Sequence, residues 1–396
     1  MPNHSEIASN WTLDPKVHFL NHGSFGAVLA EIQEIQQDYR DRLEREPVDF
    51  LLRALPPLFD AARERVAEFV GADPAGLVFT SNATAGINAV LRSMRFEPGD
   101  ELLCTNHGYN ACQNVLQFVA DRWGAKVVVA DVPFPLKSED QVVEAIEAAV
   151  TPRTKLALID HVTSPTGLVF PIERILQGME ARGIDTIVDG AHGPGMLPLD
   201  LRKLNAPYYV ANGHKWLCAP KTVGMLYVRE DRRDRIVPAI ISHGANSPRE
   251  GYTQIQTDFD WPGTVDPTPM LCLAKSIDAL GQLLPGGWNE IYSTNRAMAL
   301  HGRDLLCEAL DIPAPAPDSM IGNLAAATLP DLSPDVITGP FIPDPLHTAL
   351  WENHKVEIPV FNYPGKPSRL IRLSAHLYNR VENYAALAAG VRAELG

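Results

Sequence analysis

Short runs of apolar, mostly β-branched residues recur along the middle of the chain, with longer segments of helical periodicity between them. Continuous apolar runs predict strands that are buried on both faces, which is typical of a parallel sheet. The intervening segments place apolar residues three and four apart, the spacing of an amphipathic helix. The pattern therefore predicts an α/β fold with a mainly parallel sheet flanked by helices. The predicted strands lie at residues 77–80, 102–105, 126–130, 155–160, 186–189, 208–211 and 224–228.

This alternation ends near Pro269. Beyond it, residues 270–284 and 288–309 have helical periodicity, and a proline-rich piece at 312–317 precedes a weaker mixture of helix and strand signals. We therefore expect an N-terminal arm over residues 1–20, a large domain over 21–275 and a smaller α+β C-terminal domain over 276–396.

The composition excludes several classes of protein. A net charge of −14 over 396 residues disfavours binding to nucleic acid or to an anionic membrane. No stretch approaches the length of uncharged apolar residues that a membrane-spanning helix needs. The five cysteines are scattered and form no CxxC pair, which argues against a disulfide framework and favours a cytoplasmic protein. The sequence contains no HExxH and no GxxxxGK[ST] motif, so neither a metal site nor a nucleotide site is expected.

Chemically suggestive residues follow several predicted strands, at the edge where ligands of open α/β sheets bind. Small and hydroxyl residues at 81–86 open a helix, which suits an anion. Asp189 ends one strand and Lys215 follows the next. Each feature alone is commonly a helix cap, a turn former or a structural lysine. Together they match the needs of pyridoxal phosphate, namely a Schiff-base lysine, a carboxylate for the pyridine nitrogen and a helix start for the phosphate.

Further stretches, spread in order along the chain, carry a family resemblance, at residues 19–26, 46–53, 80–88, 188–195, 213–217, 261–267 and 372–374. Through them the chain resembles the class V aminotransferase superfamily of fold-type I enzymes, and within it the isopenicillin N epimerase branch. The resemblance implies a fold-type I architecture, in which the large domain binds pyridoxal 5'-phosphate on a seven-stranded type of sheet. It also implies a homodimer whose subunits share their active sites.

The resemblance assigns roles around the cofactor ring. Lys215 is expected to form the Schiff base, with Lys221 as the alternative lysine. Asp189 is expected to pair with the pyridinium nitrogen, which keeps the ring protonated and electron-withdrawing. His192 and Ser164 are expected to contact the phenolate oxygen of the cofactor.

The phosphate group of the cofactor is expected to be held from two subunits. Ala83 and Thr84 stand at the start of the helix that follows the first strand, and Asn212 and His214 precede the cofactor lysine. Thr264 matches a Gly-Thr motif that, in relatives, reaches the phosphate bound to the neighbouring subunit.

Other matching residues are expected to face the ring or the substrate. Tyr109 is expected to stack on the ring, with His107 as the alternative. Arg372 is expected to bind the substrate carboxylate, because a guanidinium matches a carboxylate with two hydrogen bonds. Arg369 is expected to be a surface residue.

The loop with Asn21 and His22 is expected to approach the substrate. His22 and His376 both depart from the residues that the epimerase branch leads us to expect at these positions. Both departures concern the surroundings of the substrate, where enzymes of one family differ in specificity.

The leading functional hypothesis is an epimerase-like enzyme acting at the α-carbon of an amino-acid-like substrate. Epimerisation needs two proton carriers, here Lys215 with either Tyr109 or His22. The alternatives are a C–S β-lyase or cyclising enzyme of specialised metabolism, an aminotransferase, and a non-catalytic scaffold, which the intact set of site residues disfavours. Sulfur transfer through a persulfide is also disfavoured, because the last cysteine, Cys307, falls within an expected helix.

Overall fold

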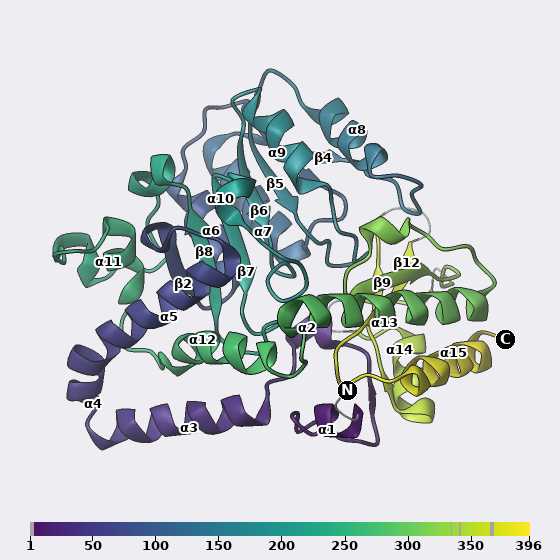
Figure 1. Ribbon diagram of the computed structural model, residues 1–396. Coiled ribbons are helices and arrows are strands. Elements are labelled where there is room, and N and C mark those ends of the chain that lie inside the picture. Colours follow the sequence, from purple (N-terminus) through teal and green to yellow (C-terminus); the bar gives the residue numbers. More distant parts are fainter. Residues whose placement is uncertain (1–3, 334, 340–341, 365–367) are drawn as a thin grey trace.

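The computed structural model describes residues 4–333, 335–339, 342–364 and 368–396, so the first three residues of the expected arm lie outside the described part. The centre of the molecule is a seven-stranded sheet with the strand order β2-β8-β7-β6-β5-β3-β4 (Figure 1). Its strands are β2 (Leu77–Thr80), β3 (Glu101–Thr105), β4 (Lys126–Ala130), β5 (Thr154–Asp160), β6 (Asp185–Asp189), β7 (Tyr208–Asn212) and β8 (Gly224–Val228).

The predicted fold class is confirmed. Neighbouring strands from β7 to β4 pair in parallel, and β8 is antiparallel to both β2 and β7. All residues of β2, β3, β7 and β8 are buried, as continuous apolar strands covered on both faces should be. The carboxyl ends of β5, β6 and β7 consequently meet at one edge of the sheet.

Helices cover the sheet and extend beyond it (Figure 1). Their ends follow local chemistry, since Gly71 ends α5 in a left-handed conformation (φ 63°) and the Asn82 side chain caps α6 by accepting from the Ala85 N–H. The helices are α1 (His4–Ala8), α2 (His22–Phe25), α3 (Ala30–Arg45), α4 (Pro47–Asp49), α5 (Leu55–Val70), α6 (Ala83–Ser93), α7 (Asn110–Trp123), α8 (Asp140–Ala149), α9 (Ile172–Glu180), α10 (Leu201–Leu204), α11 (Gln254–Asp260), α12 (Thr268–Gly281), α13 (Gly287–Leu310), α14 (Pro345–His354) and α15 (Val381–Leu395).

The C-terminal part carries a separate three-stranded antiparallel sheet with the order β11-β12-β9, beside α13, α14 and α15 (Figure 1). Its strands are β9 (Leu324–Thr328), β11 (Val360–Asn362) and β12 (Arg369–Ser374). The N-terminal segment joins this part of the molecule, because β1 (His18–Phe19) pairs in parallel with β10 (Val356–Glu357). The division into domains at residue 275 stays a prediction.

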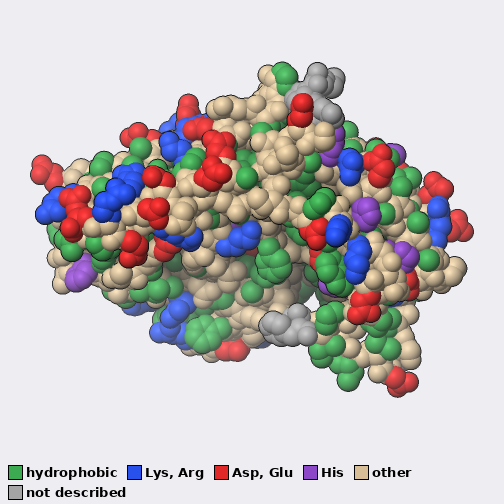
Figure 2. Space-filling view, turned by 90° about the horizontal axis from the view of Figure 1, so that it is seen from below, with side chains coloured by type: hydrophobic (Ala, Val, Ile, Leu, Met, Phe, Trp, Pro, Cys, Tyr) green, Lys and Arg blue, Asp and Glu red, His purple; other side chains and the backbone are tan. Residues whose placement is uncertain are grey.

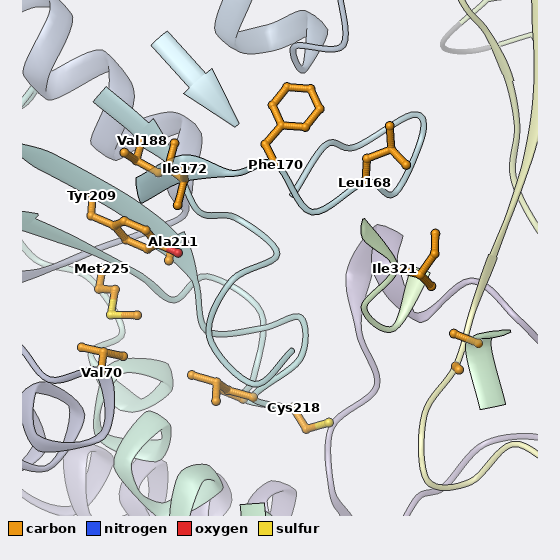
Figure 3. Close-up of a cluster of buried hydrophobic side chains, with 14 of the residues drawn as sticks. Val70, Leu168, Phe170, Ile172, Val188, Tyr209, Ala211, Cys218, Met225 and Ile321 are labelled. Atoms are coloured by element: carbon orange, nitrogen blue, oxygen red, sulfur yellow. The ribbon is translucent and has the colours of Figure 1, made fainter. Parts of the chain in front are cut away.

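The hydrophobic core runs from the central sheet towards the C-terminal part. Figure 3 shows Val188, Tyr209 and Met225 side by side on neighbouring strands of the central sheet, with Ile321 at the far end of the same cluster. All five cysteines are buried and free of disulfide bonds. Acidic and basic side chains are interspersed on the face in Figure 2. None of the described helices combines the length and the apolarity that crossing a bilayer requires.

Candidate active site

The site forms where β6 and β7 end and the following loops turn back over the sheet edge. Asp189 is the last residue of β6, and Asn212 is the last residue of β7, three positions before Lys215. The Asn212 Oδ1 accepts a hydrogen bond from the Ala83 backbone N–H at 2.9 Å. This bond links the start of α6 to the segment that carries Lys215. It therefore helps to fix the position of the helix N-terminus relative to the lysine.

Lys215 lies in a hydrogen-bonded chain with His192 and Trp216. The Lys215 Nζ is 3.1 Å from the His192 Nε2, and the Trp216 indole N–H donates to the His192 Nδ1 at 3.1 Å. Burial, with a further contribution from the charge of Arg372, lowers the pKa of Lys215 to about 8, against the opposing charge of Asp189. An amine with this pKa has a substantial unprotonated, nucleophilic fraction near neutral pH.

Asp189 is a buried carboxylate with few donors around it. Its Oδ1 accepts from the Ala191 backbone N–H at 3.0 Å, and its Oδ2 accepts from the Cys112 thiol at 3.3 Å. Burial raises the pKa of Asp189, while the hydrogen bonds from Ala191 and Cys112 and the charge of Lys215 lower it. In the neighbouring strand, Asp160 pairs in register with Asp189 and is also buried.

The predicted phosphate residues fall into two groups. Ala83 and Thr84 begin α6, and His214, whose Nδ1 bonds the Val223 carbonyl at 3.2 Å, lies next to Lys215. Thr264 is exposed and lies in the loop between α11 and α12. A cavity of about 770 Å³ adjoins the start of α6, and its walls include Gly263 next to Thr264.

Arg372 reaches the site from β12 of the C-terminal sheet. Its guanidinium is 1% exposed and donates to the Ser164 backbone carbonyl, with the Ser164 and Ser24 hydroxyls each at 3.4 Å. It also lies 4.9 Å from the centroid of the Phe361 ring. Its Nε has no hydrogen-bond partner, and none of the ion pairs among the described residues includes Arg372. A buried guanidinium in these surroundings is suited to a carboxylate ligand.

The expectation that Arg369 lies on the surface is wrong. Its side chain is buried and forms an ion pair with Asp344 at 2.6 Å, because Asp344 precedes α14 and points at the same strand.

Tyr109 and His107 have clearly different surroundings. Tyr109, at the start of α7, is 48% exposed, and burial of the remainder together with the charges of Cys112 and Asp189 raises the pKa of its hydroxyl. His107 is fully buried, with its Nδ1 at 2.7 Å from the Thr166 hydroxyl and its Nε2 at 2.8 Å from the Tyr363 hydroxyl. Both ring nitrogens of His107 are therefore engaged and its ring is buried, whereas about half of the Tyr109 side chain is exposed.

His22 is fully buried and contacts the backbone of Lys215. Its Nδ1 is 2.8 Å from the Tyr378 hydroxyl and its Nε2 is 3.0 Å from the Lys215 carbonyl. Complete burial lowers the pKa of His22 to about 3. This geometry does not fit the role of proton carrier that the sequence suggested for His22. The ring of His376 stacks on that of His22 with a centroid distance of 4.3 Å, so His376 packs against a residue that contacts Lys215.

Asn21, predicted to bind substrate, makes two contacts within the protein. Its amide nitrogen donates to the Glu357 Oε1 at 2.9 Å, and its oxygen accepts from the Ser24 hydroxyl at 2.5 Å. The Ser24 hydroxyl in turn lies 3.4 Å from the Arg372 guanidinium, so Asn21 orients a hydroxyl that contacts Arg372.

Three residues of the site were not singled out from the sequence. Cys112, Ser24 and Trp216 all contact a predicted site residue directly. Ser24 and Trp216 had a signal, because they lie in the stretches 19–26 and 213–217 that carry the family resemblance. Cys112 comes from a helix distant in sequence, and only the fold shows its contact with Asp189.

The donor set fits pyridoxal phosphate. Lys215 offers a buried amine of lowered pKa, Asp189 a buried carboxylate for a protonated ring nitrogen, and α6 a helix N-terminus for the phosphate. His192 offers a ring nitrogen next to the lysine.

Comparisons with known proteins identify the family of the chain. The family model described as aminotransferase class-V matches residues 24–299. Isopenicillin N epimerase of Streptomyces clavuligerus is 34% identical, with 99% of this chain and 98% of that protein covered. A probable chloroplastic L-cysteine desulfhydrase of Arabidopsis thaliana is 27% identical, with 97% and 84% covered. The crystal structure of the cysteine desulfurase CsdA from Escherichia coli has the same fold, with a TM-score of 0.78, 22% identity and coverage of 100% and 99%.

Proposed function

The chain belongs to the class-V aminotransferase family and is a pyridoxal-phosphate enzyme, and we propose that it inverts the α-carbon of an amino-acid-like substrate, as an isopenicillin N epimerase-like enzyme. The observation that carries this proposal is the 34% identity to a named epimerase over 99% of the chain. The buried guanidinium of Arg372, the lowered pKa of Lys215 and the half-exposed Tyr109 support the same proposal.

Pyridoxal phosphate, when bound, makes the bonds at the α-carbon of an amino acid labile by drawing their electrons into its ring. In this proposal Lys215 holds the cofactor and then moves the α-proton, while Asp189 keeps the ring nitrogen protonated. His192 and Ser164 orient the ring through its phenolate oxygen. Thr84, Asn212 and His214 hold the phosphate from the same subunit.

The substrate carboxylate binds to Arg372 in this proposal. The guanidinium is held by the Ser164 carbonyl and lies beside the Ser24 hydroxyl, so its orientation is fixed before the substrate arrives. Fixing one end of the substrate places the α-carbon at a constant position relative to Lys215.

Inversion requires a second proton carrier on the side of the α-carbon away from Lys215. We assign this role to the Tyr109 hydroxyl, because His22 has both ring nitrogens engaged within the protein. Tyr109 is half-exposed at the start of α7, and burial together with the charges of Cys112 and Asp189 raises the pKa of its hydroxyl, so the hydroxyl stays protonated near neutral pH.

The second candidate function is C–S β-elimination, which the 27% identity to an L-cysteine desulfhydrase favours. That reaction releases a β-substituent and needs no second proton carrier. Transfer of sulfur through a cysteine persulfide has less support, because the last cysteine of the chain, Cys307, is buried in α13. Transamination is a third outcome of the same first step.

The experiment that tests the proposal incubates the enzyme and cofactor in D2O with a panel of L- and D-amino acids and follows the α-proton and the products by NMR. Deuterium at the α-carbon together with the opposite enantiomer supports epimerisation. A keto acid with ammonia and a released β-group supports the lyase instead, and a keto acid with an aminated cofactor supports transamination. Tyr109→Phe should lose inversion by about 100-fold while still exchanging the α-proton of one enantiomer.

We also propose a homodimer in which Thr264 completes the phosphate site of the partner subunit. The exposed position of Thr264 supports this arrangement. Light scattering tests the dimer, and mixing inactive Lys215→Ala with inactive Thr264→Ala should restore about a quarter of the activity through hybrid dimers. A monomer, or no recovery on mixing, contradicts shared sites.

A further inference from the structure

The indole of Trp216 fixes which hydrogen-bonding form of His192 the site can hold. An indole N–H is a donor only, and it lies 3.1 Å from the His192 Nδ1. The Nδ1 must therefore accept, so it carries no proton. Burial, together with the charge of Lys215, lowers the pKa of His192 far below its ordinary value, which leaves a neutral ring with a single N–H. That proton is on the Nε2.

The Nε2–H of His192 then determines the state of Lys215. The Nε2 is 3.1 Å from the Lys215 Nζ, and because the Nε2 is the donor, the Nζ must accept with a lone pair. An ammonium has no lone pair, so the contact favours the unprotonated amine. We propose that Trp216 is a positioning residue that locks His192 as the Nε2–H tautomer and thereby favours the free amine of Lys215.

The packing around Trp216 keeps its N–H in this direction. The side chain is 1% exposed, and its ring lies 4.9 Å from that of His22 and is stacked at 6.3 Å on that of His376. These two buried histidines therefore restrict rotation of the indole ring.

Charged and titratable groups face Lys215 from several elements. Arg372 on β12 opposes its protonation, whereas Asp189 on β6, Asp160 on β5 and Cys112 on α7 favour it. His214, beside Lys215 in the same loop, and His22 also face His192 and disfavour a charged ring there. The carboxylates thus raise the pKa of Lys215, and the guanidinium of Arg372 lowers it. The hydrogen bond from His192 further favours the unprotonated amine.

The inference rests on the assignment of Lys215 as the cofactor lysine, but the tautomer is measured in the protein itself. The holoenzyme, labelled with 15N-histidine, is examined by long-range 1H–15N correlation NMR between about pH 5 and pH 8, the range in which a histidine ordinarily titrates. His192→Gln identifies the His192 signals by their disappearance. We expect the Nε2–H tautomer without titration over this range. A Nδ1–H tautomer or a titrating ring in the wild-type protein overturns the proposal.

Trp216→Phe removes the indole N–H and should give a mixture of His192 tautomers. The apoenzyme of this variant should recapture added pyridoxal phosphate about tenfold more slowly at pH 7, corresponding to a rise of about one unit in the pKa of Lys215. Trp288→Phe is the matched control, because its indole donates to the Ile277 carbonyl, away from the site.

Unchanged tautomer and recapture rate in folded Trp216→Phe overturn the role of Trp216. A Trp216→Phe protein that fails to fold leaves the wild-type tautomer as the deciding measurement. Failure of the proposed epimerase function would appear in the product analysis and would leave the tautomer measurement unaffected.

Discussion

Replacing Arg372 by Met should make the protein more stable and the enzyme nearly inactive. Arg372 is 1% exposed, and burial lowers its pKa from 12.5 to about 9. The guanidinium stays charged at neutral pH, so the cost of burying it, at most about 5 kcal/mol from that difference, weakens the fold. Losing its hydrogen bond to the Ser164 carbonyl costs about 1.5–3 kcal/mol. The free energy of unfolding should therefore rise by about 2 kcal/mol in Arg372→Met.

The matched control is Arg369→Met, three residues away on the same strand. Arg369 is also buried but is paired with Asp344 at 2.6 Å, so its loss leaves an unpaired buried carboxylate and should cost about 3–5 kcal/mol. Urea denaturation of both variants measures the stabilities. The kcat/KM of Arg372→Met should fall about 100- to 1,000-fold, because two charge-assisted hydrogen bonds to the substrate are lost. If Arg372→Met unfolds as easily as Arg369→Met, the reasoning about an unpaired guanidinium is refuted.

Three further predictions concern the surroundings of the site. Gly26→Ala should destabilise the protein by more than about 2 kcal/mol in urea denaturation, because Gly26 has φ +70° and a Cβ there would lie 1.9 Å from the His214 carbonyl oxygen. Lys221→Met should keep the visible cofactor band that borohydride bleaches, since the Lys221 Nζ donates to the Gly26 carbonyl at 3.1 Å; loss of the band would make Lys221 the cofactor lysine. The His347 Nε2 lies 3.7 Å from the Glu357 Oε1, and this interaction raises the pKa of His347 above 6.5 and lowers that of Glu357 below 4.5. Their pairing therefore stabilises the fold between these values and is lost as the pH rises through the His347 pKa. Accordingly, His347→Ala should cost about 0.5 kcal/mol at pH 5.5 and almost nothing at pH 8, and a cost independent of pH would contradict the pairing.

The sequence predicted the strands of the central sheet almost to the residue. The predicted strand at 77–80 is β2 (Leu77–Thr80), and that at 224–228 is β8 (Gly224–Val228). These limits were accurate because β-branched runs between turn residues have few alternative structures. The pairing of β1 with β10 could not be predicted, because these strands have two residues each and lie far apart in the chain.

Some features of the site could likewise be predicted from the sequence, and others could not. Asp189 and Lys215 could be proposed from their positions after strands, because parallel strands bring their carboxyl ends to one edge. Arg369 was misjudged because a charged residue is ordinarily exposed, and nothing local indicates that Asp344 folds against it. The tautomer of His192 depends on the direction of one indole N–H, which no sequence pattern encodes.

His22, where the resemblance to the epimerase branch predicts another residue, is expected to affect specificity through the position of Lys215. His22 joins the Tyr378 hydroxyl to the Lys215 carbonyl through its two ring nitrogens, at 2.8 and 3.0 Å. Tyr378 follows β12, the strand that carries Arg372. The same C-terminal segment therefore sets the position of the guanidinium directly and that of the lysine through His22. Because two reacting groups must keep their spacing within a fraction of an ångström, His22 is where a change behind the site would alter the fit of a substrate between Arg372 and Lys215.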